Sequence, residues 1–248
     1  MTEPEVNQTH ETPHVPIWER DFSDLKRPKA HEPLLTTLEG LTGKIVIMGG
    51  SFDPLHNAHL EMAKQVRDFT EAVALILIPT AQNPLKAHQT VASGEDRVQM
   101  IRETLVHEPN LYVSPIEIDR EGKAPSYTAD TMREIRSSIA EDAELFLLLG
   151  IDNVLGFKNW RGIDQIFSLV DGVMTVPRGE RGLDLITEEN TELPRDYVES
   201  LKENFLPLSI PELSSTEIRE SYKEGDDPSE LLPPEISRYI EEKALKYS

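Results

Sequence analysis

Length, composition and charge narrow the class of protein. The chain has 248 residues, of which 38% are hydrophobic, and it contains no cysteine. A chain of this size buries one sizeable core, so we expect one α/β domain with a tail, and disulfides, thiolate metal sites and cysteine nucleophiles are excluded. The formal net charge of −20 argues against nucleic acid as a partner, because a phosphate backbone requires a basic surface.

The amino-terminal part of the chain differs in composition from the rest. Residues 1–43 are acidic, contain prolines and lack hydrophobic periodicity, which predicts a tail of the kind that is often disordered. Residues 44–248 are expected to form the domain. No run approaches the ~18 apolar residues of a membrane span, and the first residues do not resemble a secretory signal. We therefore expect a cytoplasmic protein with no membrane partner.

Hydrophobic runs bounded by turn residues predict the strands and helices of the domain. Apolar, β-branched runs predict strands at residues 44–48, 72–78, 111–114, 116–118, 144–149, 170–177 and 205–210. Helical patterns begin at residue 55 or 56 and cover residues 94–101, 129–139, 197–204 and 233–240. This alternation is typical of a Rossmann-like α/β fold, an open parallel sheet with helices on both faces.

The most informative stretch follows the first predicted strand. Gly49 and Gly50 end that strand, where glycines allow a turn with positive φ and let a ligand approach main-chain N–H groups. Pro54 disfavours helix in the residue before it, so the next helix begins just after it and points its amino end at the same place. His56 and His59 lie three residues apart and so share one face of the first turn. Two imidazoles beside a helix amino end suit an anion, above all a polyphosphate.

Two other interpretations of these histidines stay open. Metal ligation would need further ligands at a recognisable spacing, and the sequence does not show that spacing. A pair of ordinary surface or core histidines is the second alternative. If the ligand is a polyphosphate, its site must be locally positive within an acidic chain, and Mg²⁺ is needed to screen the phosphates.

The run Gly-Gly-Ser-Phe-Asp-Pro-Leu-His-Asn-Ala-His, from Gly49 to His59, resembles a known signature. It is similar to that of the nucleotidyltransferases with an HxGH motif, and specifically of the bacterial nicotinate-nucleotide adenylyltransferases. The resemblance spans about residues 44–243 and implies a nucleotidyltransferase type of sheet. Ala58 departs from the pattern, because the family usually has glycine there. Its methyl group could narrow the phosphate site, although alanine suits a helix better than glycine does.

Three later segments also match the family pattern. Ser126 or Thr128 is expected to cap the helix at residues 129–139, and the resemblance implies that Tyr127 and Thr128 hold the nicotinate carboxylate. It likewise makes Trp160 a stacking platform for the pyridine ring and Lys86, on the loop after the second strand, a phosphate contact. The alternatives are a simple helix cap, a core tryptophan and an exposed lysine without a role.

Two further places complete the predicted site. Residues 214–216 offer capping hydroxyls, and Arg219 lies within a turn of that helix end. Such a cap is common in isolation, and only the resemblance makes it an ATP-phosphate element. Gly150 and Asp152 follow another buried strand, where an aspartate suits either ribose hydroxyls or a turn cap.

The resemblance implies adenylyl transfer, in which the 5′-phosphate of nicotinate mononucleotide attacks the α-phosphorus of ATP. The sequence shows no catalytic triad, Walker A loop or carboxylate pair, so positioning and charge stabilisation are expected to carry the chemistry. The implied catalytic residues are His56, His59 and Arg219, with His59 stabilising the transition state. The implied ATP-binding residues are Gly49, Gly50, Ser51, Phe52, His56, His59, Gly150, Asp152, Ser215, Thr216 and Arg219, with Ser51 and Phe52 acting through the main chain. Mg²⁺ is expected to be held mainly by the phosphates.

Three alternatives to this function stay open. A relative that uses nicotinamide mononucleotide or phosphopantetheine would carry the same motifs. A fragment of a class I aminoacyl-tRNA synthetase is disfavoured by the short acidic chain and by the absence of a Lys-Met-Ser-Lys-Ser loop. A nucleotide-binding regulator without catalysis is the third alternative. The sequence leaves the oligomeric state open, with a homodimer as one alternative.

Overall fold

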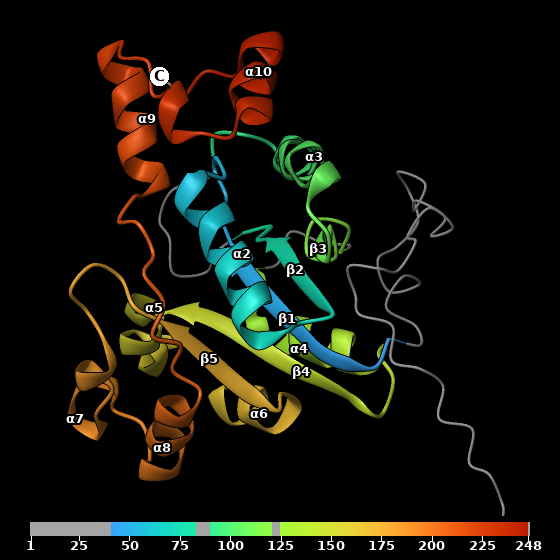
Figure 1. Cartoon of the computed structure of the whole chain (residues 1–248), viewed down its shortest axis with the longest axis vertical. Coiled ribbons are helices and arrows are strands. Elements are labelled where there is room, and N and C mark those ends of the chain that lie inside the picture. Colours follow the sequence, from blue (N-terminus) through green and yellow to red (C-terminus); the bar gives the residue numbers. More distant parts are fainter. Residues whose placement is uncertain (1–40, 83–89, 121–124, 248) are drawn as a thin grey trace, which may run out of the picture. The chain divides into compact units, whose positions relative to one another are not determined.

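A parallel sheet forms the centre of the computed structural model, which describes residues 41–82, 90–120 and 125–247. Its strands lie in the order β3-β2-β1-β4-β5, and every neighbouring pair is parallel (Figure 1). The strands are β1 (Gly43–Gly50), β2 (Ala74–Pro79), β3 (Leu111–Val113), β4 (Ala143–Gly150) and β5 (Gly172–Val176). All of the described residues belong to one compact unit.

The central strand β1 shows why these runs form strands buried on both faces. Ile45, Val46 and Ile47 are at most 1% exposed, and successive side chains point to opposite faces of the sheet. Val46 pairs with Leu75 on one side and with Phe146 on the other. A run that is apolar at every position therefore fills two cores, as a parallel sheet covered on both faces requires.

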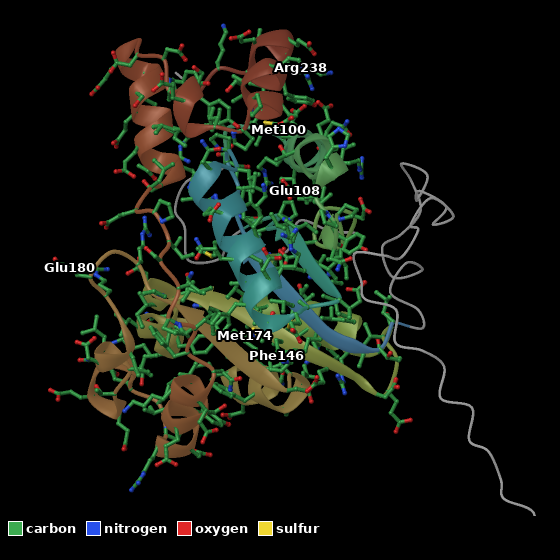
Figure 2. The ribbon with its side chains drawn as sticks, in the orientation of Figure 1. Met100, Glu108, Phe146, Met174, Glu180 and Arg238 are labelled. Atoms are coloured by element: carbon green, nitrogen blue, oxygen red, sulfur yellow. The ribbon has the colours of Figure 1, made fainter. Side chains whose placement is uncertain are left out.

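Helices cover both faces of the sheet, so the predicted fold class is confirmed. On one face lie α2 (Asn57–Thr70), α3 (Gly94–Thr104), α9 (Ser215–Glu224) and α10 (Pro234–Lys243). Their apolar side chains share a core with alternate residues of the strands, and Phe146 and Met174 of this core are labelled in Figure 2. On the other face lie α4 (Thr128–Arg136), α5 (Ile151–Leu155), α6 (Ile163–Leu169) and α8 (Arg195–Glu203).

Short helical segments connect these elements. They are α7 (Glu188–Thr191) and the 3₁₀ turns η2 (Leu105–His107), η3 (Phe157–Asn159), η4 (Leu183–Leu185) and η5 (Ser229–Leu231). Among the helices that the structure describes, none is long and apolar enough to cross a membrane. Residues 1–40 of the predicted tail and the predicted phosphate contact Lys86 lie outside the described residues.

Two predicted strands are wrong. Residues 116–118 form a turn, in which the N–H of Asp119 donates to the carbonyl of Pro115 at 2.8 Å. Residues 205–210 make only one bridge to the sheet, between Phe205 and Thr175, because Pro207 has no N–H to continue the ladder. The helix predicted at residues 129–139 is also shorter than expected, since α4 ends at Arg136.

Candidate functional site

A cavity of about 770 Å³ opens at the carboxyl ends of β1, β2 and β4. Its volume lies in the range of small-molecule sites, and this end of an open parallel sheet is where ligands bind. The predicted site residues that line it are Gly49, Gly50, Ser51, His56, His59, Tyr127, Thr128, Asp152, Trp160, Ser215, Thr216 and Arg219. Segments far apart in the sequence therefore meet around one space. Phe52 and Gly150 do not line this cavity.

The turn after β1 differs from the prediction in one respect. Positive φ occurs at Phe52, with φ of 45°, rather than at Gly49 or Gly50, which continue the extended strand. Gly50 is required for another reason, because a Cβ there would lie 2.7 Å from the Cζ atom of Phe52. The Phe52 ring is 1% exposed and packs edge-on against His59, with ring centroids 5.1 Å apart. Any contact of Phe52 with a ligand in the cavity is thus left to its main chain.

A buried arginine joins the two loops that border this part of the cavity. Arg97 of α3 is 1% exposed, and its Nη1 donates to the carbonyl of Ser51 at 2.8 Å and to that of Thr80 at 2.9 Å. Ser51 and Thr80 follow β1 and β2 directly, and both line the cavity. Because one guanidinium holds both carbonyls, Arg97 fixes the distance between the ends of the two strands.

The two histidines lie together at the amino end of α2, on one face as predicted. His56 is the N-cap residue, and its Nδ1 accepts a hydrogen bond from the N–H of His59 at 3.4 Å. Burial, together with the positive charge of Arg178, lowers the pKa of His56 from 6.5 to about 4. His56 is therefore neutral at neutral pH. Since Nδ1 accepts, its proton belongs on Nε2, where it is a donor.

The amino end of α9 is capped by its own residues. Ser214 is the N-cap, its side chain accepts from the N–H of Glu217, and the Glu217 carboxylate accepts from the N–H of Ser214 at 2.7 Å. This capping box satisfies two of the helix's orphan groups, and other N–H groups at that end remain available to an anion.

Side chains of α9 also tie it to the loop before α2. The Arg219 Nη1 donates to the carbonyl of Asp53 at 2.7 Å, and Nη2 donates to the Thr216 hydroxyl at 3.0 Å. The Ser215 hydroxyl donates to the carbonyl of Pro54 at 2.9 Å. Asp53 is in turn held by the N–H groups of two residues that precede α3. The predicted convergence of the histidine segment and the Arg219 segment on one cavity is therefore present in the structure.

Another part of the cavity lining contains the residues predicted to hold a pyridine ring. Tyr127 is the N-cap of α4 without any side-chain cap, so the predicted caps from Ser126 and Thr128 are wrong. The Ser126 hydroxyl is instead engaged by the carboxyl group of Glu117. The guanidinium of Arg161 lies 4.8 Å from the centre of the Tyr127 ring. This wall thus combines aromatic rings, a cation and the amino end of α4.

A smaller cavity of about 140 Å³ adjoins the first, and both are lined by Gly49, His56, His59 and Asp152. Gly150, which is the N-cap of α5, lines only the smaller one. Ala58 also lines the smaller cavity and not the larger one. Ala58 therefore borders the smaller cavity, and a narrowing of the phosphate site by its methyl group stays a prediction.

Asp152 holds two arginines that follow β5. Its Oδ2 accepts from Arg178 Nη1 at 2.9 Å, and its Oδ1 accepts from Arg181. Arg178 lines both cavities. Asp152, which was predicted to bind ribose hydroxyls, thus accepts a hydrogen bond from an arginine at each carboxylate oxygen. Only the remaining lone pairs of these oxygens are available to a ligand.

Sequence reasoning missed three charged residues of the site. Arg178 comes two residues after the end of β5, so the rule that selected Gly49 and Asp152 near strand ends would have selected it as well. Arg161 adjoins the predicted Trp160 and gave no separate signal. Glu117 was placed inside a predicted strand, where a lone acid between two isoleucines was the only hint.

The cavity is cationic although the chain is acidic. Among the described residues that line it, Arg161, Arg178 and Arg219 are bases, whereas Glu117 and Asp152 are acids. Burial raises the pKa of Glu117, which favours its neutral form. Within the described ranges there is no group of three or more His, Cys, Asp or Glu residues that could hold a metal ion.

Together, these features define an α/β nucleotidyltransferase, in which strand ends and helix amino ends enclose a cationic cleft. The cytidylyltransferase-like family model matches residues 47–221, which is most of the domain. Similar relatives include proteins named probable nicotinate-nucleotide adenylyltransferase from Dehalococcoides mccartyi and Streptomyces coelicolor. Each is 33% identical, over 82% of this chain and 96% of the first relative, and over 80% of this chain and 98% of the second.

The chain belongs to the nicotinate-nucleotide adenylyltransferase family. Solved structures agree with this at the level of the fold. A nicotinic acid mononucleotide adenylyltransferase of Plasmodium falciparum, complexed with NaAD, superposes with a TM-score of 0.62 at 16% identity, over 82% of this chain and 97% of that one. A putative nicotinate-nucleotide adenylyltransferase of Vibrio parahaemolyticus gives a TM-score of 0.55 at 17% identity, over 80% of this chain and 99% of that one.

Proposed function

We propose that this chain transfers the adenylyl group of ATP to nicotinate mononucleotide, giving nicotinate adenine dinucleotide and pyrophosphate, a step of NAD biosynthesis. The observation that carries the proposal is the convergence of the β1–α2 turn, the start of α4 and the start of α9 on one cavity. The cavity is large enough for two nucleotide halves, and its charge suits phosphates.

The triphosphate is assigned to the space between α2 and α9. His56, His59, Ser215, Thr216 and Arg219 surround this space, and the two helix dipoles add partial positive charge. In the reaction, the acceptor phosphate oxygen forms a bond to the α-phosphorus while the bond from that phosphorus to the β-phosphate oxygen breaks. Negative charge then grows on the pyrophosphate, where the imidazole of His59 and the guanidinium of Arg219 stabilise it.

This reaction needs no nucleophile or base from the protein, because the attacking phosphate is already an anion. The protein must instead hold two anions in line and offset their repulsion. Arg219 is preorganised for this work by its hydrogen bonds to the Asp53 carbonyl and to Thr216. Neutral His56 contributes a fixed donor rather than a charge.

The adenosine end is assigned to the smaller cavity. Gly49 and Gly150 let the ligand approach main chain there, and the carboxylate of Asp152 accepts hydrogen bonds from ribose hydroxyls. The main-chain groups of Ser51 and Phe52 complete the turn beneath the phosphates. Asp152 would share these hydrogen bonds with Arg178, since it is paired with that residue in the structure.

The acceptor is assigned to the wall formed by α4 and by the segment after α5. Trp160 offers its ring face to the pyridine, and the main chain of Tyr127 and Thr128 binds its carboxylate at the amino end of α4. The Lys86 side chain contacts a phosphate in this proposal. Arg161 adds a cation next to Tyr127, which favours an anionic ring substituent.

Mg²⁺ belongs to the proposal as the partner of ATP. The acids near the phosphates are engaged, Asp152 by Arg178 and Arg181 and Glu217 by the capping box, so the chain fits a metal held mainly by phosphates. Such a metal screens the triphosphate and stabilises the leaving pyrophosphate. A cytoplasmic location is also part of the proposal, because ATP is abundant there.

The test is a pyrophosphate-release assay with ATP, Mg²⁺ and one acceptor at a time. Nicotinate mononucleotide should give the highest kcat/KM, with the dinucleotide identified by mass. A higher value with nicotinamide mononucleotide or phosphopantetheine would replace the acceptor in the proposal. Tight ATP binding without pyrophosphate release from any acceptor would mark the chain as a nucleotide-binding regulator.

A further inference from the structure

A buried acid faces the acceptor half of the cavity. Glu117 lies in the turn after β3, is 8% exposed and lines the cavity together with Tyr127 and Trp160. Buried carboxyl groups are rare unless they are paired with a base or serve a function. Within the described part of the chain, no ion pair involves Glu117.

The two carboxyl oxygens of Glu117 have different surroundings. Oε1 accepts a hydrogen bond from the Thr131 hydroxyl at 2.8 Å. The Ser126 hydroxyl and the main chain of Ala81 also reach the carboxyl group. Oε2 is enclosed and has no hydrogen-bond partner of ordinary geometry. A buried carboxyl oxygen without a partner favours the protonated group, whose O–H is a hydrogen-bond donor.

The charges around Glu117 are few. Arg120 of the same turn and Arg97 of α3 attract its ionised form. Glu134 of α4 is paired with Arg120 at 3.0 Å, and Asp53 and Glu95 lie near Arg97. Ser126 and Thr131, the groups that face it from the start of α4, carry no charge. Burial outweighs these attractions and raises the pKa of Glu117, so the carboxylic acid persists to higher pH than in an exposed glutamate.

We propose that Glu117 determines acceptor specificity, donating a hydrogen bond from Oε2 to the carboxylate of nicotinate mononucleotide. When Glu117 ionises, it repels that carboxylate and accepts a hydrogen bond from the carboxamide N–H of nicotinamide mononucleotide instead. The enzyme's choice between the two acceptors then depends on one proton. The inference rests on the proposed function, because it concerns the acceptor side of the same cavity.

A purely structural role for Glu117 makes a different prediction. Through Thr131, Ser126 and Ala81 the side chain joins the start of α4 to the end of β2, and loosening this joint would affect both acceptors alike. The ratio of kcat/KM for nicotinate mononucleotide to kcat/KM for nicotinamide mononucleotide separates the two roles. Ionisation of ATP, of the shared 5′-phosphate and of the histidines cancels in this ratio.

The experiment measures this ratio by pyrophosphate release across the whole pH range in which the enzyme stays folded and active. In the unmodified enzyme the ratio should fall by about tenfold or more as pH rises. In Glu117→Gln, whose amide stays neutral and keeps a donor, it should stay flat. The control is Glu103→Gln on α3, which lies outside the cavity and should follow the unmodified enzyme. A flat ratio in the unmodified enzyme, or an unchanged fall in Glu117→Gln, would overturn the inference.

A second variant covers the case in which Glu117→Gln fails to fold. The hydrogen bond from Thr131 favours the ionised carboxylate, so Thr131→Val should move the fall in the ratio to higher pH. An unmoved midpoint would count against the inference. If no acceptor releases pyrophosphate, the proposed function fails. Calorimetric affinities of the two mononucleotides over the same pH range then test Glu117 independently, with the same expected fall in their ratio.

Discussion

The imidazole rings of His56 and His59 stack on each other, with centroids 3.6 Å apart and planes inclined by 19°. The stack lies at the amino end of α2 and faces both cavities. Two protonated rings at this separation would repel each other, and His56 remains neutral because burial lowers its pKa. His56 is therefore a buried neutral donor, and His59 beside it is the ring assigned to the charged phosphates.

Replacing His59 by alanine removes the donor assigned to the leaving pyrophosphate. We expect kcat to fall by about 10²–10³, because a preorganised donor at developing charge is worth that much. KM for ATP should rise less. The measurement is steady-state pyrophosphate release, with His107→Ala as the matched control, because His107 is exposed and lies outside both cavities. Near-full turnover of His59→Ala would contradict the role.

The lowered pKa of His56 makes stability depend on pH. The unfolded chain binds a proton at pKa 6.5, whereas the folded chain binds it only at about 4. The free energy of unfolding should therefore fall as pH drops below 6.5, and His56 alone should account for about 2 kcal/mol between about pH 7 and about pH 5. Urea titrations at both pH values should show a smaller loss for His56→Asn than for the unmodified chain. An equal loss would show that His56 does not stay neutral in the fold.

Arg97 should matter to stability and to catalysis together. In Arg97→Met the carbonyls of Ser51 and Thr80 lose their shared donor inside the protein, and we expect the free energy of unfolding to fall by about 3 kcal/mol. The value of kcat/KM should fall as well, because both strand ends border the cavity. Arg102→Met on the same helix is the control and should change the free energy of unfolding by less than about 0.5 kcal/mol. Equal effects of the two substitutions would refute the bridging role.

Ala58→Gly should have opposite effects on the stability of α2 and on the binding of ATP. Glycine costs about 1 kcal/mol within a helix, so the free energy of unfolding should decrease. Removing the methyl group enlarges the smaller cavity, and we expect KM for ATP to fall. Ala63→Gly on α2, which lines neither cavity, should decrease stability without lowering KM. A KM for ATP that is unchanged or higher in Ala58→Gly would contradict the assignment of the smaller cavity to adenosine.

Much of the fold could be predicted because its strands are buried on both faces. The runs at residues 45–48 and 145–149 are apolar at every position, which only a covered parallel sheet accommodates. Residues 116–118 and 205–210 are short, and their hydrophobic patterns are weaker evidence for strands. The first segment forms a turn, and the proline in the second interrupts strand pairing. Local pattern was informative where burial was complete and misleading where the segments were short.

Most residues of the candidate site could be predicted from the sequence, but the hydrogen bonds between them could not. Gly49, Asp152 and the two histidines could be selected because strand ends and helix amino ends identify them. The hydrogen bond from Arg219 to the Asp53 carbonyl joins residues 166 apart, and no spacing rule predicts such a pair. The same is true of Glu117, whose place in the cavity depends on a contact with α4.

The central claim is that separate segments hold one triphosphate between α2 and α9. The most direct test is a crystal structure with Mg²⁺ and an ATP analogue whose α,β-bridging oxygen is replaced by methylene. We predict that phosphate oxygens lie within about 3 Å of both the His59 imidazole and the Arg219 guanidinium. A triphosphate bound outside this cavity, or one that contacts neither side chain, would contradict the account.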